Sequence, residues 1–242
     1  DQLVFATPGV ALKWFSSNGL ADFDIIMIDE FHERRWDTDL LLALLLKQNR
    51  HQLLITSASM DTSAVARYMG CKAIDIPGKQ YPVTITHVAE QMRQMPSIEY
   101  LDQRVIDVVH HAISQHNGDI LVFLPGKREI ASISNKLTIE SVDVVPLYGG
   151  ISIEQQQLAL NPSCRRRIIL ATNVAETSVT VPGIEVVIDS GLERRTHQRN
   201  GRTVLGLKAI SQASALQRKG RAGRTCAGYC YRLYGETVPL DE

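Results

Sequence analysis

Short apolar runs separated by amphipathic stretches recur along the chain. Six runs dominated by apolar and β-branched residues predict buried strands, at 23–28, 53–56, 120–124, 142–147, 167–171 and 184–188. Between them, residues 99–115 repeat apolar side chains at helical spacing, and Asp37 and Asp39 offer caps and acids ahead of a leucine-rich segment that ends at Lys47. Apolar strands that alternate with helices predict an α/β protein whose parallel sheets are covered on both faces.

The pattern is interrupted once, at residues 77–82. Two prolines and a glycine lie there, and they predict a linker. Before the linker there are only two or three strands, too few for a complete doubly wound domain, whereas strand and helix alternate at least four times after it. We therefore expect two domains, 1–78 and 79–242, of which the first is incomplete.

The charge of the chain is informative only in its distribution. The 242 residues are 44% hydrophobic, which suits one large or two small globular domains, and the formal net charge is +0. Residues 190–232, however, hold ten Lys and Arg against one acid, Glu193. Such a stretch predicts a site for a polyanion, either nucleotide phosphates or a nucleic-acid backbone, although a solvated basic face is the alternative.

Within this basic stretch, residues 193–207 break the alternation of strand and helix. Two mostly polar strands flank Asn200-Gly201, which is a strong signal for a β-hairpin. The hairpin carries four arginines, Arg194, Arg195, Arg199 and Arg202. Because it lacks a clean apolar face, we expect it to project from its domain, with an ordinary surface hairpin as the alternative.

The cysteines and the longest apolar run argue against two classes of protein. The four scattered cysteines form no CxxC pair, so the sequence predicts neither a zinc site nor a disulfide framework and favours a cytoplasmic protein. The longest apolar run, 40–46, is too short to span a bilayer, and no signal-peptide pattern or membrane partner is expected. The chain opens without an initiator Met, which suggests an excised piece.

The first segment with chemical potential follows the strand at 23–28. Asp29 and Glu30 stand at the carboxyl end of this strand, where open α/β sheets bind their ligands, and His32 follows. An Asp there can hold Mg²⁺ through water, and the adjacent Glu can orient and deprotonate an attacking water. The alternative is a strand that ends in acids for solubility.

Two further loops concentrate hydrogen-bonding groups. Ser57 and Ser59 follow the strand at 53–56 and could relay a change of nucleotide state, or could simply cap a helix. Residues 171–180 gather hydroxyl and amide donors that suit phosphate or ribose contacts, unless they form an ordinary polar loop.

The fourth segment, 217–224, combines basic residues with glycines. If it is helical, Gln217, Arg221 and Arg224 share one face, and the two guanidinium groups can clamp a terminal phosphate. The glycines allow close approach of the backbone. A basic surface helix is the alternative, although glycine suits such a helix poorly.

Taken in order, these segments resemble the motifs of the DEAH/RHA helicases of superfamily 2. Asp29-Glu30-Phe31-His32 resembles motif II, and Ser57-Ala58-Ser59 resembles motif III. Residues 171–180 and 217–224 are similar to motifs V and VI, which together are highly specific, and residues 7–10 and 121–126 resemble motifs Ib and IV. Phe31 and the run Leu147-Tyr148-Gly149-Gly150 favour the bacterial HrpB/HrpA-type branch.

The resemblance implies two RecA-like lobes, the second with a β-hairpin insertion, that hold ATP or another NTP between them and RNA across their top. It implies that Glu30 is the catalytic base and that Asp29 and Glu30 hold Mg²⁺ through water. Gln217 would contact the γ-phosphate or the attacking water, and Arg221 and Arg224 would be arginine fingers. His32 is the remaining member of the implied catalytic set. It further implies nucleotide contacts by Ser178, Thr180 and Gly220, RNA contacts by Thr7, Gly9, Gly126, Thr172, Asn173 and Thr177, and coupling by Ser57 and Ser59.

The implied function is NTP-dependent translocation on RNA and its unwinding, with single-stranded RNA or a duplex with an overhang as substrate. DNA stays open as a substrate, and nothing in the sequence identifies a protein partner. The chain has no G-x-x-x-x-G-K-[ST] loop, so we expect these 242 residues alone to turn over little NTP. Two alternatives remain: a non-catalytic nucleic-acid-binding fragment, and a scaffold relative with a decayed motor.

Overall fold

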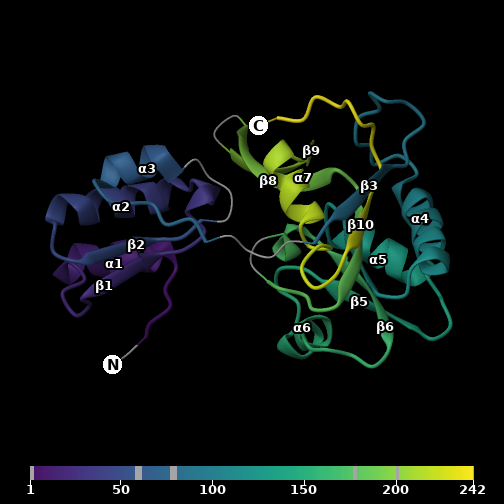
Figure 1. Ribbon diagram of the computed structural model, residues 1–242, viewed down its shortest axis with the longest axis horizontal. Helices are drawn as coiled ribbons and strands as arrows, with labels where there is room; N and C mark the ends of the chain where they lie inside the picture. The colour runs from purple at the N-terminus through teal and green to yellow at the C-terminus, as the bar shows by residue number, and fades with distance from the viewer. Residues whose placement is uncertain (1–2, 58–61, 77–80, 177–178, 200–201, 242) are drawn as a thin grey trace. The chain divides into compact units, whose positions relative to one another are not determined.

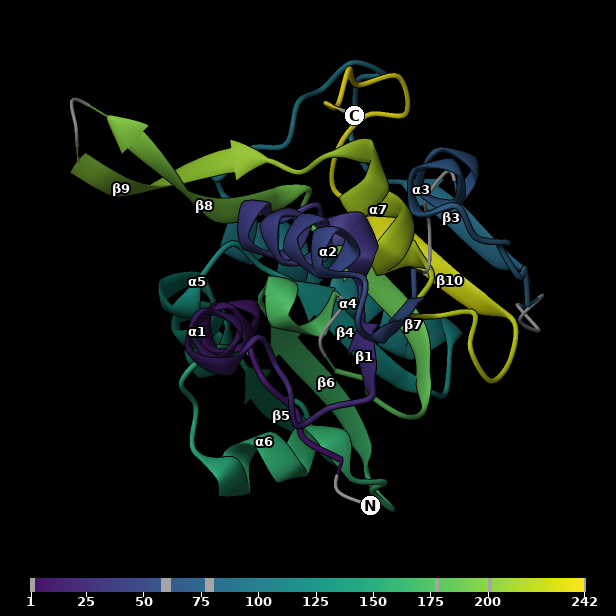
Figure 2. The ribbon, with the colours of Figure 1, turned by 90° about the vertical axis from the view of Figure 1, so that its left-hand side faces the viewer.

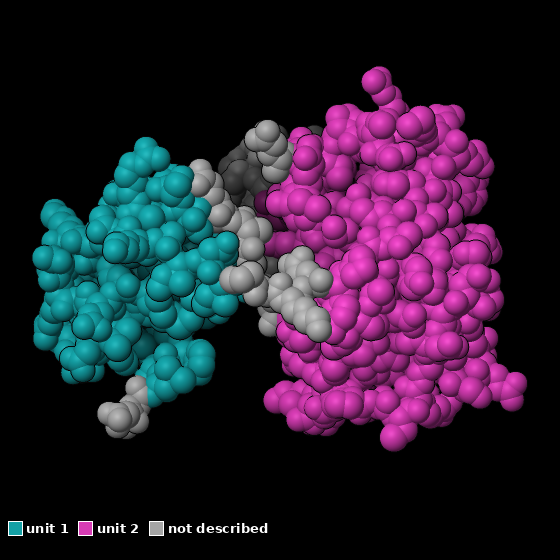
Figure 3. All heavy atoms as spheres, in the orientation of Figure 1, with its two compact units in different colours: residues 1–77 teal, residues 78–242 magenta. Residues whose placement is uncertain are grey.

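The computed structural model describes residues 3–57, 62–76, 81–176, 179–199 and 202–241. The chain forms two compact units, residues 1–77 and residues 78–242, which Figure 3 shows in different colours. The predicted linker at 77–82 lies at the division between them, although residues 77–80 are outside the described part.

Unit 1 is built on a pair of short parallel strands. β1 (Ile25–Ile28) and β2 (Gln52–Ile55) pair in parallel. The helices are α1 (Pro8–Asn18), α2 (Trp36–Gln48) and α3 (Thr62–Met69), and η1 (Phe31–Glu33) is a 3-10 turn. Pro8 opens α1 where its missing N–H is no loss, and Gly19 ends it in the left-handed conformation, with φ of 66°.

The core of unit 1 forms where α2 meets the strands. Its buried side chains are Leu20, Ile28, Phe31, Leu41, Leu42 and Leu45. The expectation that the segment with Asp37 and Asp39 caps this helix is wrong, because the N-cap is Arg35, but both acids lie in the first turn, ahead of the leucines, as expected. They still complement the positive end of the helix dipole there, and Asp37 accepts two hydrogen bonds from Arg35.

Unit 2 is a six-stranded parallel sheet with helices on it (Figure 1). The strand order is β3-β10-β7-β4-β6-β5, and every pair is parallel. The strands are β3 (Val83–His87), β4 (Asp119–Phe123), β5 (Val142–Leu147), β6 (Arg166–Ala171), β7 (Ile184–Asp189) and β10 (Gly228–Arg232). The helices are α4 (Leu101–Gln115), α5 (Lys127–Lys136), α6 (Ile153–Leu160) and α7 (Gln212–Lys219), and η2 (Asn173–Ala175) is a 3-10 turn.

Both faces of this sheet are buried, as the continuous apolar strands predict. Alternate residues of β4 enter different cores: Ile120 and Val122 belong to one buried cluster, and Leu121 and Phe123 belong to the other. This separation follows from the two-residue period of a strand. The prediction of an α/β chain with parallel sheets is therefore confirmed.

The predicted hairpin forms its own two-stranded antiparallel sheet, with β8 (Leu192–Arg199) and β9 (Arg202–Ala209) paired along their lengths. Figure 2 shows the arm extending away from the six-stranded sheet. Its base is anchored, because Glu193 is buried and Ile210 N donates to Gly191 O at 3.0 Å. Leu205, farther out on β9, is exposed. Among the described residues, no helix is long and apolar enough to cross a membrane.

Candidate nucleotide and nucleic-acid sites

In unit 1, the end of β1 presents the two predicted acids. Asp29 Oδ1 accepts a hydrogen bond from Glu30 N at 3.0 Å and another from the Thr56 hydroxyl. Glu30 has a left-handed backbone, with φ of 53°, which is uncommon outside glycine and occurs often at functional sites. Its carboxylate lies 3.3 Å from His32 Nε2 and is 41% exposed, whereas the His32 side chain is only 7% exposed. The base of the turn is therefore packed while the Glu30 carboxylate faces solvent.

Thr56, which the sequence analysis did not single out as functional, fastens the two strand ends together. Its N–H donates to Ile28 O at 3.0 Å, its carbonyl accepts from Phe31 N at 3.1 Å, and its hydroxyl holds Asp29. Of the predicted coupling residues, Ser57 follows Thr56 directly, and Ser59 lies outside the described residues. The only signal for Thr56 was its place as the last residue of the predicted strand at 53–56.

The residues at the β1 end fit a magnesium ion held through water. Within the described ranges, no group of three or more His, Cys, Asp and Glu side chains is arranged to hold a metal ion by itself. Mg²⁺ commonly keeps several waters and uses one or two carboxylates together with substrate phosphates. An exposed Asp29 fixed by Thr56 could supply such a carboxylate, and NTP phosphates and water would supply the remaining ligands.

The other predicted residues of unit 1 lie at the start of α1. Thr7 is the N-cap residue of the helix, and its carbonyl accepts from Ala11 N at 3.0 Å. Gly9 is exposed in the first turn, and a Cβ added to it would meet nothing within 4 Å. Neither residue is needed for packing, so both are accessible to a ligand.

In unit 2, a groove of about 480 Å³ forms beside the hairpin. Three predicted RNA contacts, Gly126, Thr172 and Asn173, line it. They lie where the chain leaves the carboxyl ends of β4 and β6. The remaining lining residues include three cations and two exposed or half-buried apolar groups: Lys127, Arg128, Arg194, Tyr148 and Leu205, with Pro125 and Gly149.

The hairpin is held against this groove by Arg194. Its Nη2 donates to Glu129 Oε1 at 2.7 Å, in the first turn of α5. A Cβ on Gly126 would lie 2.8 Å from Arg194 Nε, so glycine at this position makes room for the arginine. Lys127 Nζ lies 4.7 Å from the centre of the Tyr148 ring, which places a cation and an aromatic face together on the wall.

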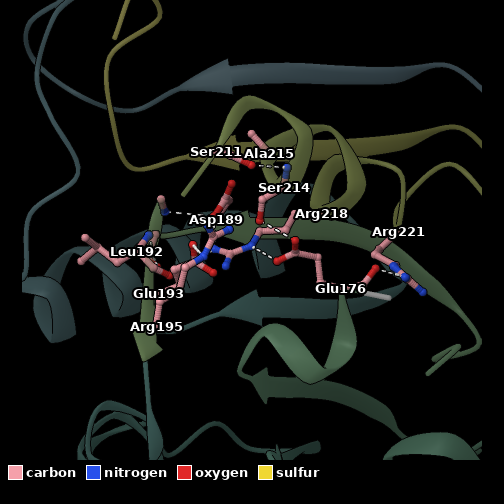
Figure 4. Close-up of polar contacts among 12 residues, drawn as sticks. Glu176, Asp189, Leu192, Glu193, Arg195, Ser211, Ser214, Ala215, Arg218 and Arg221 are labelled. Atoms are coloured by element: carbon pink, nitrogen blue, oxygen red, sulfur yellow. Dashed lines mark hydrogen bonds and ion pairs between the residues drawn. The ribbon is translucent and has the colours of Figure 1, made fainter. Parts of the chain in front are cut away.

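Beside the groove, motifs V and VI are joined by a buried polar network (Figure 4). Arg218 is fully buried; its Nε donates to Glu176 Oε2 at 2.9 Å and its Nη1 to Asp189 Oδ1 at 2.9 Å. Ser214 donates to the second oxygen of Glu176, and the Tyr234 hydroxyl donates to Asp189 Oδ2 at 3.1 Å. The alternative of a basic surface helix is therefore wrong for Arg218.

Charges in this network shift in the directions that burial and pairing dictate. Burial by itself would lower the pKa of Arg218, but Asp189 and Glu176 outweigh it and hold the pKa above its ordinary value. Burial raises the pKa of Glu193, at the base of the hairpin, and its partner Arg195 reduces that rise. The pair is asymmetric, because the Glu193 side chain is 4% exposed and the Arg195 side chain is 56% exposed.

The prediction that Gln217, Arg221 and Arg224 share one helical face is wrong. Helix α7 ends at Lys219, with Gly220 as its C-cap, so the two arginines lie in the turn that follows. Arg221 is buried and donates to Val179 O at 2.9 Å and to Glu176 O. Arg224 is exposed and donates to Thr180 Oγ1 at 2.8 Å.

These bonds bring the nucleotide side of motif V against motif VI. Gln217 is half buried on α7, Gly220 is exposed, and Thr180 meets Arg224 directly. Thr177 and Ser178 lie outside the described residues. Arg218, Glu176 and Asp189 are functional candidates that the sequence pattern did not reveal, and the strand-end position of Asp189 was the only signal for any of them.

The geometry agrees with known proteins. The sequence-family model for the helicase conserved C-terminal domain matches residues 98–226, just over half of the chain. The ATP-dependent RNA helicase HrpA of Escherichia coli is 40% identical over 248 residues, which cover 95% of this chain and 18% of that protein. The crystal structure of the E. coli DEAH/RHA helicase HrpB has a TM-score of 0.85 at 32% identity and covers 97% of this chain and 32% of that chain.

The chain belongs to the DEAH/RHA helicases of superfamily 2. Within this family it lies in the bacterial HrpA/HrpB branch, as Phe31 and the run at 147–150 predicted. The RecA-like fold class is likewise confirmed, with a β-hairpin in the second lobe.

More distant members of the family match over almost the same length. The pre-mRNA-splicing factor ATP-dependent RNA helicase prp22 of Schizosaccharomyces pombe is 36% identical over 92% of this chain and 20% of that protein. The chain therefore spans about a fifth of the length of HrpA and prp22.

Proposed function

We propose that this chain supplies motor elements of an NTP-driven helicase that translocates on RNA and unwinds it. One observation carries the proposal: the groove in unit 2 brings motif IV, motif V and the hairpin together around three cations. A groove of that composition suits a phosphate backbone, which binds mainly through Lys and Arg and releases counterions. The named activities of HrpA and prp22 support the choice of RNA.

For NTP hydrolysis, Glu30 is the proposed base and Asp29 the proposed magnesium holder. The exposed carboxylate of Glu30 can orient a water and accept its proton while the water oxygen bonds to the γ-phosphorus. The bond from the γ-phosphorus to the β-phosphate oxygen breaks, and inorganic phosphate and the nucleoside diphosphate are released. Asp29, fixed by Thr56, can bind Mg²⁺ through water, and the ion would offset phosphate charge. His32 supports Glu30 from the packed side of the turn.

Arg224 and Arg221 are the proposed fingers, and the structure gives them different starting points. Arg224 is exposed beside Thr180, one of the proposed nucleotide contacts. Arg221 already donates to two motif V carbonyls and must exchange at least one of these bonds to reach a phosphate. We therefore propose that Arg224 contributes more than Arg221 to stabilising the negative charge on the γ-phosphate. Gln217 is proposed to orient the attacking water.

RNA binding in the groove should depend on the backbone more than on the bases. Thr172 and Asn173 offer hydroxyl and amide groups, and Lys127 and Arg128 offer charge. Phosphate and sugar contacts fix register without identifying sequence, so we propose weak sequence preference. Thr7 and Gly9, at the start of α1 in unit 1, are further proposed RNA contacts, and DNA is a second candidate ligand for the groove.

The test uses the full-length protein and a matched pair of arginine variants. Arg128 is exposed in the groove, whereas Arg165 is exposed at the amino end of β6, where it pairs with Asp143 at 3.3 Å. Arg128→Ala should weaken single-stranded RNA binding across sequences and lower the salt slope of binding by about 1, and Arg165→Ala should do neither. Wild-type hydrolysis should rise with RNA and should drive displacement of a duplex with an overhang.

Three outcomes would contradict the proposal. RNA binding without any NTP hydrolysis would favour the non-catalytic alternative. Hydrolysis that DNA oligonucleotides stimulate and RNA oligonucleotides do not would reassign the substrate. Equal RNA affinity in the two arginine variants would place the binding site elsewhere.

A cytoplasmic location is also proposed. All four cysteines are free thiols, and three of them, Cys71, Cys164 and Cys226, are exposed. Exposed thiols are better preserved in a reducing compartment. Alkylation of native protein from a cell extract should modify these three if the proposal is right, and their recovery as disulfides would contradict it.

A further inference from the structure

One buried arginine in unit 2 contacts three segments that the proposed function uses separately. Arg218 lies on α7 within motif VI and donates to Glu176 in motif V. Its Nη1 also donates to Asp189 at the end of β7, and to Leu192 O, at the base of the hairpin, at 3.3 Å. Its guanidinium also lies 4.9 Å from the centre of the Phe123 ring, and the side chain is fully buried.

One end of this network is rigid. Asp189 is fully buried and accepts from Arg218, from the Tyr234 hydroxyl and from Gly191 N. It is the last residue of β7 and is paired with β10 on one side and with β4 on the other. A carboxylate with three donors on a paired strand offers little freedom to the guanidinium bound to it.

The other end is a loop residue with two separate connections. The carboxylate of Glu176 accepts from Ser214 and Arg218, both on α7, while its backbone carbonyl accepts from Arg221. Glu176 also immediately precedes Thr177 and Ser178 in sequence, the proposed contacts to RNA and nucleotide. A displacement of the motif V backbone would therefore move a group on which Arg221 depends.

We infer that Arg218 and Glu176 are positioning residues that couple RNA binding at motif V and the hairpin base to the placement of Arg221. This inference rests on the proposed function. A broken buried ion pair leaves an uncompensated charge, so the Arg218–Glu176 pair is expected to stay closed. Because Asp189 holds Arg218, the closed pair fixes the carboxylate of Glu176. RNA contacts on one side of Glu176 would then alter the hydrogen bonds that hold the proposed finger on the other side.

The chain contains a matched control for a purely structural role. Arg167 is also buried, pairs with Asp119 at 2.6 Å, and donates to Asn161 O at 2.6 Å and to Pro182 O at 3.0 Å. Asp119 and Arg167 lie near the amino ends of β4 and β6, whereas the groove lies at the carboxyl ends of these strands. Arg167 therefore resembles Arg218 in burial and charge but touches none of the proposed RNA or NTP contacts.

The experiment compares Arg218→Lys, Glu176→Gln and Arg167→Lys in the full-length protein. Lysine keeps the charge but cannot bridge two carboxylates and a carbonyl with one planar fork. Glutamine keeps the size of Glu176 and removes its charge. For each variant, NTP hydrolysis is measured with and without saturating single-stranded RNA, and RNA affinity and the midpoint of thermal unfolding are measured in parallel.

We expect Arg218→Lys and Glu176→Gln to lower the ratio of RNA-stimulated to RNA-free turnover by about tenfold, within the usual range of coupling between sites. RNA affinity should change by less than about threefold, because neither residue is a proposed RNA contact. Arg167→Lys should leave the ratio of RNA-stimulated to RNA-free turnover within about twofold of wild type. This should hold even if Arg167→Lys lowers the unfolding midpoint as much as Arg218→Lys does. The double variant should lose about tenfold, and not about a hundredfold, because the two residues act through one connection.

Several results would overturn the inference while leaving the helicase proposal intact. One is an equal loss of RNA-free and RNA-stimulated turnover, and another is the same stimulation ratio for Arg218→Lys and Arg167→Lys. Additive losses in the double variant would also separate the two residues. If wild-type protein shows no stimulation by RNA, both proposals fall. If Arg218→Lys does not fold, Glu176→Gln carries the same comparison.

Discussion

Gly223 and Gly220 lie three positions apart in motif VI, yet the structure predicts opposite outcomes when each is replaced by alanine. A Cβ on Gly223 would lie 2.7 Å from the Tyr81 carbonyl oxygen and 2.7 Å from Val83 Cγ2. The same backbone is held there by Tyr81 N, which donates to Gly223 O at 3.0 Å. A Cβ on Gly220 would lie 3.4 Å from its nearest neighbours, and its φ of −62° suits alanine.

The magnitudes follow from these distances. Overpacking costs about 1–3 kcal/mol, and because the obstacle at Gly223 includes a hydrogen-bonded backbone, we expect about 2–3 kcal/mol for Gly223→Ala. In a unit of this size each kcal/mol changes the unfolding midpoint by about 2–4 °C, so the midpoint should fall by about 4–12 °C. Gly220→Ala should be neutral or stabilising by up to about 1 kcal/mol, because alanine restricts the unfolded chain more than glycine does.

The assay is thermal and urea unfolding of the 242-residue chain, followed by circular dichroism, with both variants beside wild type. Equal midpoints for the two variants would refute the steric argument. So would a Gly223→Ala protein as stable as wild type, because the turn would then relax without cost and the glycine would have another purpose.

In the full-length protein, Glu30→Gln should retain NTP binding but lower turnover by about 10²-fold or more, since an amide cannot accept the proton; near-normal steady-state turnover would remove Glu30 from the base role. Replacing residues 197–204 with a short Gly-Ser turn leaves the Arg194–Glu129 ion pair in place. RNA-stimulated hydrolysis should then persist while displacement of a duplex strand drops. Loss of both activities together would mean that the hairpin supports the fold. Burial raises the pKa of Glu193, so its ionised form destabilises the native state at neutral pH and this cost disappears as the pH falls through the raised pKa. Glu193→Gln should therefore have a larger unfolding free energy than wild type at neutral pH, with the excess shrinking towards pH 4.5, and a constant difference across a pH series of urea titrations would contradict this.

The strands that sequence reasoning identifies are those whose surroundings leave a local signature. β4, β6 and β7 lie inside the sheet, so their residues are buried on both faces and nearly continuous in apolar character. β5 lies at one edge but keeps Val145 and Leu147 buried, whereas β3 lies at the other edge with Thr84 and Thr86 exposed. β10 follows directly after motif VI and mixes glycine and tyrosine with apolar residues, so neither strand produces a clear period.

The candidate residues divide along the same line. Asp29, Glu30 and the groove residues Thr172 and Asn173 follow predicted strands, and the structure places them at strand ends. The burial of Arg218 could not be predicted, because Glu176 and Asp189 lie 42 and 29 positions away in sequence. A basic run looks the same locally whether it faces solvent or distant carboxylates.

Because β10 lies between β3 and β7, the six-stranded sheet of unit 2 cannot be completed until β10 has been synthesised. β3 is the first strand of this unit to be synthesised, but its only partner in the described sheet is β10, the last. The ring of His87, at the end of β3, contacts the carbonyl of Tyr234, 147 positions later. Such distant pairing slows folding, and until β10 arrives one edge of β7 stays open to pairing with other chains. A piece trimmed to residues 98–226 would lack both strands and keep that edge exposed, which makes it prone to aggregation even though every residue of motifs V and VI is present.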